Sequence, residues 1–483
     1  MGRAIEFILN SERRSVSGAA PTMTALDWLR SVEFACGTKE GCAEGDCGAC
    51  TIVFGEVDGE RMRYQAVNSC LVMLGQLAGK HVLTVEGLAD ADGTPHAVQQ
   101  ALVETDASQC GFCTPGFVMA MFAFFHSGEN VDDDATIHDM LAGNLCRCTG
   151  YRPIVDAVKW AANADVDRFA AAETASIAAL NALPGATGEA FGNASQSFHV
   201  PRTLAELLQL RAENPDAYIL AGGTDLGLLA SKERQALETV IHLSGVDELR
   251  YVRRTGSHLE IGAAATYTDA LPEIEALYPS MAAMIRRIGS RQIRNLGTVC
   301  GNVGNASPIG DMPPCLIALD ATVVLNAADR GRREIAIEEF FLDYRKTDLR
   351  ASEIIEAVRI PHIEDHQVFH VYKVSKRFDQ DISAVIVAYR LGLDDGTVTD
   401  IRIAYGGMAA TSRRAHDCEA ALTGAPWTAE TAAVGAAALA SDYAPISDFR
   451  ASARYRATVA GNLVRRLHLQ TTDAESVPEV IAQ

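Results

Sequence analysis

The stretch GCAEGDCGAC, from Gly41 to Cys50, places three cysteines and three glycines within ten residues. No aromatic or branched side chain stands among them, so the stretch has no means of building a hydrophobic core. In a reducing compartment, close-set cysteines are typical of metal ligands or redox centres rather than of disulfides. The stretch is therefore a candidate metal loop, and the chain on either side of it indicates which metal.

A fourth cysteine downstream completes a known spacing. Four residues separate Cys42 from Cys47, two separate Cys47 from Cys50, and nineteen separate Cys50 from Cys70. This is the plant-type ferredoxin spacing, which ligates a two-iron two-sulfur (2Fe-2S) cluster. Glycines permit the positive φ and the close approach by which backbone N–H groups reach the inorganic sulfurs, here at positions 41, 45 and 48. The alternative, a structural zinc loop, normally pairs two C-x2-C knuckles.

A second cysteine set follows in CGFC and CRC, which contain Cys110, Cys113, Cys146 and Cys148. A C-x-C pair is too tight for a usual zinc knuckle. It can place two thiolates on one iron at a helix N-terminus, where the helix dipole favours anions. Spacing alone favours iron–sulfur over zinc here and leaves both open.

The other cysteines lie outside these spacings. We expect Cys36 to be a buried thiol rather than a ligand. Cys300, Cys315 and Cys418 have no ligand spacing among them and are expected to be thiols of the core.

Composition narrows the class of protein. The chain has 483 residues, of which 48% are hydrophobic and 22% charged, as in globular proteins of three or four domains. A formal charge of -20 opposes binding to nucleic acid or to an anionic membrane. The N-terminus has no signal-peptide pattern, and no run of eighteen apolar residues predicts a membrane span. We expect a cytoplasmic protein.

Hydrophobic patterning predicts an α+β protein of several domains. Short strands are expected in RAIEFIL, CTIVFGEV, RMRYQAV and HVLTVEG, with one helix in MTALDWLRS capped by Thr24. Helices are then expected in PHAVQQALVET, PGFVMAMFAFFHS, ATIHDMLAGNL and PIVDAVKWAAN. The small, polar composition of residues 164–197 predicts a linker with one helical turn. A new α+β region follows, and near residue 375 strands such as AVIVAYRL and IRIAYGG precede Ala-rich helices.

Two stretches in this later part predict ligand contacts. ILAGGTDLGLL, residues 219–229, is a strand followed by a glycine turn whose N–H groups can approach a pyrophosphate, although such a turn is more often a plain connection. Residues 288–319 are rich in Gly, Asn, Ser and Pro and lead into an apolar run expected to be a strand, which favours an ordered loop around a ligand.

Four motifs in one order, GCAEGDCGACTIVF, NSC, QCGFCTPGF and GNLCRCTGYRPI, resemble the iron–sulfur half of the molybdenum hydroxylase family, which includes xanthine dehydrogenase, aldehyde oxidase and carbon monoxide dehydrogenase. The resemblance implies a β-grasp ferredoxin domain (1–87) and a four-helix 2Fe-2S domain (88–163). The resemblance also implies a linker (164–197), followed by an FAD-binding domain of the vanillyl-alcohol-oxidase (PCMH) type (198–370). The chain then ends in a C-terminal α+β domain like that of the CO dehydrogenase flavoprotein (371–483). The resemblance makes the eight cysteines of the two sets the ligands of two 2Fe-2S clusters.

The same resemblance assigns residues to FAD. They are Leu220, Ala221, Gly222, Gly223, Thr224, Asp225, Leu226 and Gly227 around the diphosphate, and Thr298, Val299, Cys300, Gly301, Asn302, Ser307, Asp311, Leu349 and Lys373 at other parts of the cofactor. It also implies a loop controlling NAD access, formed by Arg377, Phe378, Asp379, Gln380 and Asp381, and it places Gln109 and Cys148 near a pterin.

Within the family, KVSKRFDQDISAV and YGGMAATSRRA look like xanthine dehydrogenases. The resemblance then implies an electron-transfer small subunit without catalytic side chains of its own, in a likeness to two-chain bacterial enzymes. Electrons from molybdopterin-bound molybdenum on a large partner subunit would pass through the Cys110 cluster, the Cys42 cluster and FAD to NAD+, with two small and two large subunits in a heterotetramer. Alternatives are the same subunit of an aldehyde or N-heterocycle hydroxylase using oxygen or a quinone, and a zinc-stabilised adaptor.

Overall fold

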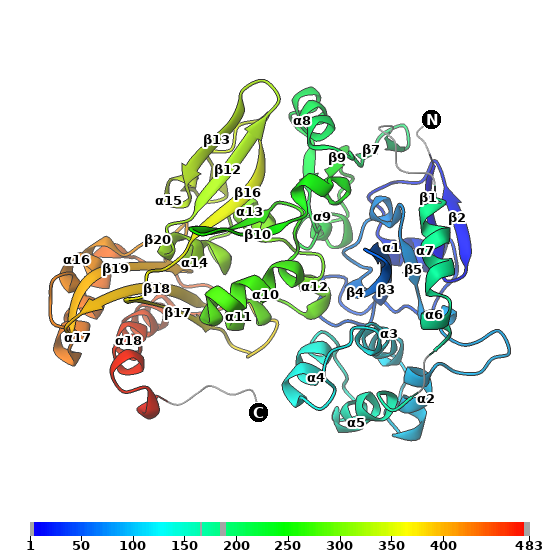
Figure 1. Ribbon diagram of the computed structural model, residues 1–483, viewed down its shortest axis with the longest axis horizontal. Coiled ribbons are helices and arrows are strands. Elements are labelled where there is room, and N and C mark those ends of the chain that lie inside the picture. Colours follow the sequence, from blue (N-terminus) through cyan, green and yellow to red (C-terminus); the bar gives the residue numbers. More distant parts are fainter. Residues whose placement is uncertain (1–3, 165–166, 184–189, 478–483) are drawn as a thin grey trace. The chain divides into compact units, whose positions relative to one another are not determined.

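The computed structural model describes residues 4–164, 167–183 and 190–477. Its contacts divide the chain into two compact units, one comprising residues 1–247 with 289–297 and the other residues 248–288 with 298–483 (Figure 1). Arg3, at the start of the first expected strand, and parts of the expected linker and C-terminal domain lie outside the described residues.

The first unit begins with a mixed sheet. Among the described residues its order is β2-β1-β5-β3-β4, with β1 Ile5–Leu9, β2 Glu12–Val16, β3 Thr51–Asp58, β4 Arg61–Asn68 and β5 His81–Leu83. The expected helix is α1, Ala25–Ser31, whose N-terminus is capped by the Thr24 side chain. Alternate residues of β1 point into the core, where Phe7 packs edge-on against Trp28 of α1.

This sheet differs from the expectation in two local features. Strand β2, with the sequence ERRSV, was not predicted because it is an exposed edge strand without apolar alternation. HVLTVEG was expected to be one strand, but β5 ends at Leu83 and Val85–Gly87 form a 3-10 turn. Other 3-10 turns lie at Leu74–Leu77, Leu243–Gly245, Asp247–Leu249 and Ala474–Ser476.

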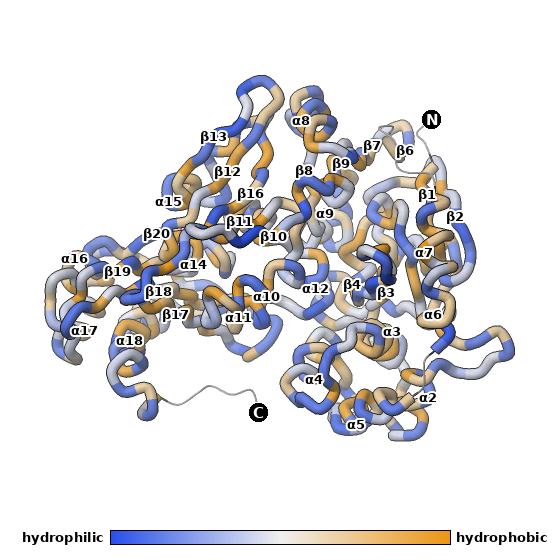
Figure 2. Tube along the Cα trace, viewed as in Figure 1, coloured by the Kyte–Doolittle hydropathy of each residue, from blue (hydrophilic) through white to orange (hydrophobic). Residues whose placement is uncertain are grey.

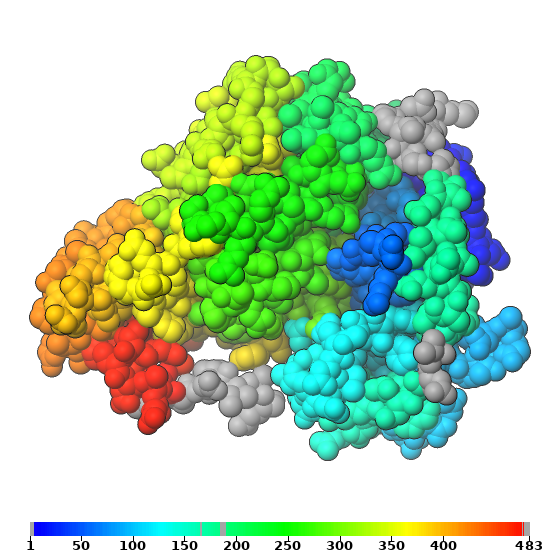
Figure 3. Space-filling view, in the orientation of Figure 1, coloured from blue at the N-terminus to red at the C-terminus, as the bar shows by residue number. Residues whose placement is uncertain are grey.

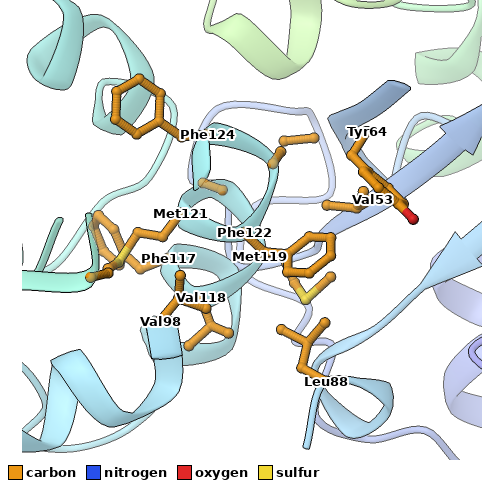
Figure 4. Close-up of a cluster of buried hydrophobic side chains, with 14 of the residues drawn as sticks. Val53, Tyr64, Leu88, Val98, Phe117, Val118, Met119, Met121, Phe122 and Phe124 are labelled. Atoms are coloured by element: carbon orange, nitrogen blue, oxygen red, sulfur yellow. The ribbon is translucent and has the colours of Figure 1, made fainter. Parts of the chain in front are cut away.

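The four helices expected next are all present: α2 Ala97–Glu104, α3 Thr114–Phe125, α4 Asp134–Leu141 and α5 Arg152–Ala161. Pro115 and Pro153 occupy the first turns of α3 and α5, where a proline costs no helical hydrogen bond. Helix α3 is buried from Gly116 to Phe124, and Figure 4 shows its side chains spreading toward Val53 and Tyr64 as well as toward Leu88 and Val98.

The stretch expected to be a linker contains more helix than one turn. Helix α6 spans Arg168–Ala171 and α7 spans Glu173–Asn181. Phe169 is buried in the same core as α3, and the Glu173 side chain accepts a hydrogen bond from the Met62 N–H at 2.8 Å. Figure 3 shows α7 at the surface beside the β4 region. The buried Phe169 ring and the Glu173 hydrogen bond hold this Ala-rich stretch against the domain before it.

The first unit ends with a small sheet of order β6-β7-β9-β8, in which β7 and β8 both pair in parallel with β9. The strands are β6 Phe191–Gly192, β7 Ser197–His199, β8 Tyr218–Leu220 and β9 Thr239–His242. Helices α8, Leu204–Glu213, and α9, Gly227–Ser231, connect them. Helix α12, Arg291–Arg294, also belongs to this unit although it lies far along the sequence.

In the second unit, an antiparallel sheet has the order β10-β11-β16-β12-β13. Its strands are β10 Val252–Arg254, β11 His258–Gly262, β12 Thr322–Ala327, β13 Gly331–Ala336 and β16 Ile354–Pro361, with a ribbon of β14 Phe341–Asp343 and β15 Lys346–Thr347. The helices of this part are α10 Tyr267–Leu277, α11 Pro279–Arg286, α13 Val299–Asn305, α14 Met312–Ala318 and α15 Ile337–Phe340. Figure 2 shows hydrophilic β13 at the edge, next to the more hydrophobic β12.

The expectation of a strand at the end of residues 288–319 is wrong, because that apolar run is helix α14. Pro313 and Pro314 stand in its first turn, where their fixed φ starts a helix. A short apolar run does not distinguish a buried strand from a buried helix.

The C-terminal part has the sheet order β17-β18-β19-β20, followed by helices as expected. The elements are β17 Gln367–Val374, β18 Val385–Asp394, β19 Thr397–Gly406, β20 Arg413–Arg414, α16 His416–Leu422, α17 Ala429–Asp442 and α18 Ala453–Thr472. Across the described ranges, no helix has the length and apolar character needed to cross a membrane.

Candidate redox-cofactor sites

The first cysteine set forms two pairs of sulfur atoms. The side chains of Cys42 and Cys47 hydrogen-bond each other, as do those of Cys50 and Cys70. The bond from Cys47, with backbone N–H groups including that of Glu44, lowers the pKa of Cys42 to about 5. The same bond raises the pKa of Cys47, so the loop stabilises the thiolate, the form that binds metal, at Cys42 in this pair.

Nitrogen donors surround these sulfurs. The N–H groups of Glu44 and Cys47 each donate to Cys42 Sγ at 3.4 Å, and the Asn68 side chain approaches Cys50 Sγ at 3.9 Å. Hydrogen bonds to sulfur are one means by which a protein sets the potential of an iron–sulfur cluster.

The glycines of the loop are required for two different reasons. Gly45 and Gly48 have positive φ values of 83° and 68°, as expected. Gly41 does not share this conformation, but a β-carbon on it would lie 2.7 Å from Cys47 Sγ. Close approach, and not φ, explains this glycine.

The second set is paired in the same way, Cys110 with Cys148 and Cys113 with Cys146. Cys113 is the N-cap residue of α3, while CRC lies in the loop before α5. The helix N-terminus expected for CRC therefore serves CGFC instead. Cys146 Sγ accepts from the N–H of Cys148 at 3.4 Å and from the Thr149 hydroxyl at 3.2 Å.

The pairing distinguishes between the two metals. Four thiolates around one zinc, with Zn–S near 2.3 Å, would all lie within about 3.8 Å of one another. Within the described chain, no three cysteine sulfurs lie within 4.8 Å of each other. A two-iron cluster instead takes two thiolates on each iron, so two pairs per set suit 2Fe-2S and do not suit zinc.

The two sets are in contact. A β-carbon on Gly116 of α3 would lie 2.3 Å from the Gly48 carbonyl oxygen, so α3 packs directly on the first loop. Asn144 Nδ2 donates to the same oxygen at 3.0 Å, and the Leu145 N–H donates to the Cys47 carbonyl at 3.0 Å. The chain thus holds the two metal loops at a short, fixed separation.

Burial differs between the sets. Cys50 and Cys70 are buried, whereas Cys110 and Cys148 are exposed, as is Gln109. Phe112 and Leu145 are also exposed, by 49% and 47%. The second set therefore faces the surface, where another protein could reach it.

Among the remaining cysteines, the expectation for Cys36 is wrong. Its thiol is exposed, because it lies in the polar loop between α1 and the metal loop. Cys300, Cys315 and Cys418 are buried as expected, and burial raises the pKa of Cys300 to about 12.

The glycine turn between β8 and α9 carries free backbone donors. Among the described residues, no carbonyl accepts a hydrogen bond from the N–H groups of Gly222 to Leu226. Gly223 has a φ of 80°, and a β-carbon on Gly222 would lie 1.7 Å from the Leu296 carbonyl oxygen. A turn with unpaired N–H groups and no room for a side chain at Gly222 fits an anion such as the diphosphate of FAD.

In the second unit, Asp311 and Lys373 are in direct contact. Lys373 Nζ lies 2.5 Å from Asp311 Oδ2, and the Ser383 hydroxyl donates to Asp311 Oδ1 at 2.6 Å, with all three residues buried. The Thr298 side chain caps α13 by accepting from the Gly301 N–H at 2.8 Å. Of the other residues expected here, Val299 and Cys300 are buried, and Asn302 and Ser307 accept from the N–H groups of Met312 and Ile309. The Leu349 N–H donates to Thr347.

The loop of residues 377–381 is held at both ends. The Arg377 N–H donates to the Asp381 side chain at 2.9 Å. Arg287 donates to the carbonyl oxygens of Phe378 and Lys373 at 2.9 and 3.0 Å, and its guanidinium lies 4.5 Å from the centre of the Phe378 ring. Arg287 was not predicted, because no sequence motif connects it to a loop ninety residues away.

Two other groupings were missed. His96, His126 and Asp167 meet in the helical part of the first unit, with both imidazole Nε2 atoms within 3 Å of Asp167 Oδ2. His96 Nδ1 accepts from the Val98 N–H, so Nε2 carries the proton, which favours a hydrogen bond to Asp167 over a metal. Lys232 contacts the first cysteine loop through Cys42 and Glu44. These residues are too distant in sequence to form a recognisable motif.

Three known domain families match parts of the chain. Residues 84–159 match a 2Fe-2S binding domain, residues 191–363 match the FAD binding domain in molybdopterin dehydrogenase, and residues 370–471 match the CO dehydrogenase flavoprotein C-terminal domain.

Several xanthine dehydrogenases are similar in sequence to this chain. The chain is 32% identical to that of Emericella nidulans, over 88% of this chain and 35% of the relative, and 30% identical to xanthine dehydrogenase 1 of Arabidopsis thaliana, over 87% and 36%. It therefore spans about a third of the length of these relatives.

Solved structures extend the comparison. A carbon monoxide dehydrogenase chain from Hydrogenophaga pseudoflava is 31% identical, with a TM-score of 0.53 over 56% of this chain and 94% of that one. Quinoline 2-oxidoreductase from Pseudomonas putida 86 is 26% identical, with a TM-score of 0.54 over 58% and 98%. By these domain matches and relatives, the chain belongs to the molybdenum hydroxylase family.

Proposed function

We propose that this chain is the electron-transfer subunit of a xanthine dehydrogenase, one that hydroxylates xanthine and hypoxanthine to urate with reduction of NAD+. The observation that carries the proposal is the arrangement of eight cysteines as two sets of two pairs, beside a glycine turn with free N–H groups. When bound, 2Fe-2S clusters carry single electrons and FAD converts them to a hydride for NAD+.

The eight cysteines are the proposed ligands: Cys42, Cys47, Cys50 and Cys70 for one cluster, and Cys110, Cys113, Cys146 and Cys148 for the other. The N–H and hydroxyl groups that donate to these sulfurs hold the thiolates in place. The buried position of Cys50 and Cys70 keeps water from the first cluster, while the exposed second set would face the partner.

For FAD, the proposed contacts are those of the resemblance. The turn from Leu220 to Gly227 would bind the diphosphate through the unpaired N–H groups of Gly222 to Leu226. The resemblance also assigns Thr298, Asp311 and Lys373 to FAD. We further propose that the Arg377–Asp381 loop controls access of NAD+.

Molybdenum and its pterin are proposed to reside on a large partner subunit, in a heterotetramer of two copies of each chain. The exposed Phe112 and Leu145 beside Cys110 and Cys148 support a docking surface at the second set. The boundaries proposed for the domains are 1–87, 88–163, 198–370 and 371–483, with α6 and α7 between the second and third.

A second candidate is the same subunit of an N-heterocycle or aldehyde hydroxylase with another electron acceptor. The structural likeness to quinoline 2-oxidoreductase favours it. The two candidates share every residue named here and differ in the partner's substrate and in the acceptor.

One experiment separates them. The chain is co-expressed with its partner, and turnover of xanthine, quinoline and an aldehyde is measured with NAD+, oxygen or a quinone. Xanthine oxidation with NAD+ supports the proposal. Quinoline or aldehyde oxidation without NADH formation supports the second candidate. A colourless, zinc-containing preparation would contradict both.

A further inference from the structure

Helix α9 follows the glycine turn and reaches both cysteine pairs of the first set. At its start, a β-carbon on Gly227 would lie 2.5 Å from the carbonyl oxygen of Leu71, the residue after Cys70. Leu228 packs against the small cluster of buried side chains that contains Cys50 and Cys70. The residue that ends this helix, Lys232, instead contacts the loop at Cys42.

Lys232, the C-cap residue of α9, contacts the Cys42 side of the loop. Its Nζ donates to the Cys42 carbonyl oxygen at 3.0 Å and lies 3.0 Å from Glu44 Oε2. The Glu44 N–H in turn donates to Cys42 Sγ. Two residues later, Arg234 lies 3.3 Å from Asp27 and 4.0 Å from Glu40. The segment after α9 therefore places two cationic side chains beside acidic residues.

The negative charges near Lys232 determine its electrostatic effect on the first cluster. The loop contains Glu40, Glu44 and Asp46, and reduction of a 2Fe-2S cluster adds one electron and therefore one more negative charge. A cation fixed on the Cys42 carbonyl stabilises that extra charge, whereas an unpaired Glu44 opposes it.

We infer that Lys232 is a positioning residue that raises the reduction potential of the first cluster and couples its loop to the helix that follows the glycine turn. The inference rests on the proposed function only in that it requires a 2Fe-2S cluster at Cys42, Cys47, Cys50 and Cys70. It does not depend on the substrate or on NAD+. The ammonium charge acts through space, so the effect should follow charge rather than side-chain length.

The test is a redox titration of the full chain, with dithionite as reductant and both cluster signals followed by EPR. In Lys232→Met we expect the equilibrium constant for one-electron reduction of the first cluster to fall three- to tenfold, where tenfold is about 59 mV. Lys232→Arg should stay near the wild-type value. Glu44→Gln, which keeps the bond of Lys232 to Cys42, should shift the potential upward.

The experiment has two controls, the second cluster of the same protein and a variant of another exposed lysine. The second cluster should keep its potential in each of these variants. Lys159→Met removes a comparably exposed lysine, paired with Asp134 at 2.7 Å, and should leave the first cluster unchanged. If Lys232→Met fails to retain the first cluster, the Glu44→Gln shift decides the question.

Two results would overturn the inference: unchanged potentials in both Lys232→Met and Glu44→Gln, or an equal shift in Lys232→Arg and Lys232→Met. Wild-type protein without two cluster signals would instead refute the proposed function. The two failures are therefore distinguishable.

Discussion

Gly227 starts helix α9 against the carbonyl oxygen of Leu71, with no room for a β-carbon between them. Leu71 follows Cys70, and Gly227 ends the turn whose N–H groups are free. The end of the glycine turn is therefore packed backbone to backbone against the residue that follows Cys70, a member of the first cysteine set.

The first prediction follows from this contact. In Gly227→Ala the new methyl would lie 2.5 Å from a backbone oxygen, which cannot rotate away as a flexible side chain could. We expect a loss of about 1–3 kcal/mol in the free energy of unfolding, the usual cost of overpacking. FAD content and the EPR signal of the first cluster should also change.

Gly256→Ala is the matched control for this substitution, because a β-carbon there would have no neighbour within 4 Å. It should leave stability, FAD and both clusters as they are. Full retention of FAD and of the first cluster signal by Gly227→Ala would contradict the close packing of turn and loop.

The second prediction concerns Asp167, which caps α6 and accepts from both His96 and His126. Burial alone would raise the pKa of Asp167, but the bonds from His126 and His96 hold it below its usual value. A carboxyl with a lowered folded-state pKa contributes stability above its unfolded pKa of about 3.9, and that contribution is lost as the pH falls further.

Asp167→Asn should therefore cost about 1–3 kcal/mol near pH 7, as expected for hydrogen bonds to a buried charged group. The difference in melting temperature between wild type and variant should shrink below about pH 4. Asp156→Asn, at an exposed pair with Arg152, should have little effect. A constant difference from pH 7 to pH 3 would refute the role given to the carboxylate.

The third prediction tests the buried pair of Lys373 and Asp311. Lys373→Met leaves the Asp311 carboxylate buried with the Ser383 hydroxyl as its remaining side-chain donor, which should cost about 3–5 kcal/mol. The double variant Lys373→Met, Asp311→Leu should regain most of this, because it removes the unpaired charge. Denaturant unfolding measures both.

Ser383→Ala provides the scale for this comparison, since it removes one hydrogen bond and no charge. It should cost about 1.5–3 kcal/mol, the range for a hydrogen bond to a charged group. If the double variant were no more stable than Lys373→Met, the loss would come from packing and not from the buried carboxylate.

Local signals were enough for the helical part and for the cysteine sets. Helices α2 to α5 have apolar spacing, and α3 and α5 have prolines in their first turns. Most of the cysteines stand in short spacings, Cys42 to Cys50, Cys110 to Cys113 and Cys146 to Cys148. Local patterns did not predict the elements whose structure depends on tertiary contacts. ERRSV forms strand β2 by pairing with β1, and Phe169 draws an Ala-rich stretch into the core beside α3.

Contacts between residues far apart in the sequence could not be predicted for the same reason. Arg291 and Arg294 lie more than 150 residues after Asp139, yet both form ion pairs with it and bring residues 289–297 into the first unit. Lys232 is likewise 190 residues from the carbonyl it contacts. A single sequence holds no sign of such pairs, because each residue alone is an ordinary surface charge.

The last prediction separates the two cysteine sets. Serine keeps the size of cysteine but provides no thiolate, so Cys148→Ser and Cys70→Ser should each lose one cluster. Iron should fall from about four to about two atoms per chain, with loss of a different EPR signal in each variant. Cys36→Ser is the control, because this exposed cysteine stands outside both sets of pairs.

Loss of the second cluster should also affect one electron-transfer reaction and spare another. In Cys148→Ser, substrate oxidation by the assembled enzyme should no longer reduce NAD+, because the second set would receive electrons from the partner. Oxidation of NADH by an artificial dye should persist, since FAD would remain bound and the first set intact. Loss of dye reduction in a Cys148→Ser protein that still contains FAD would contradict this order of carriers.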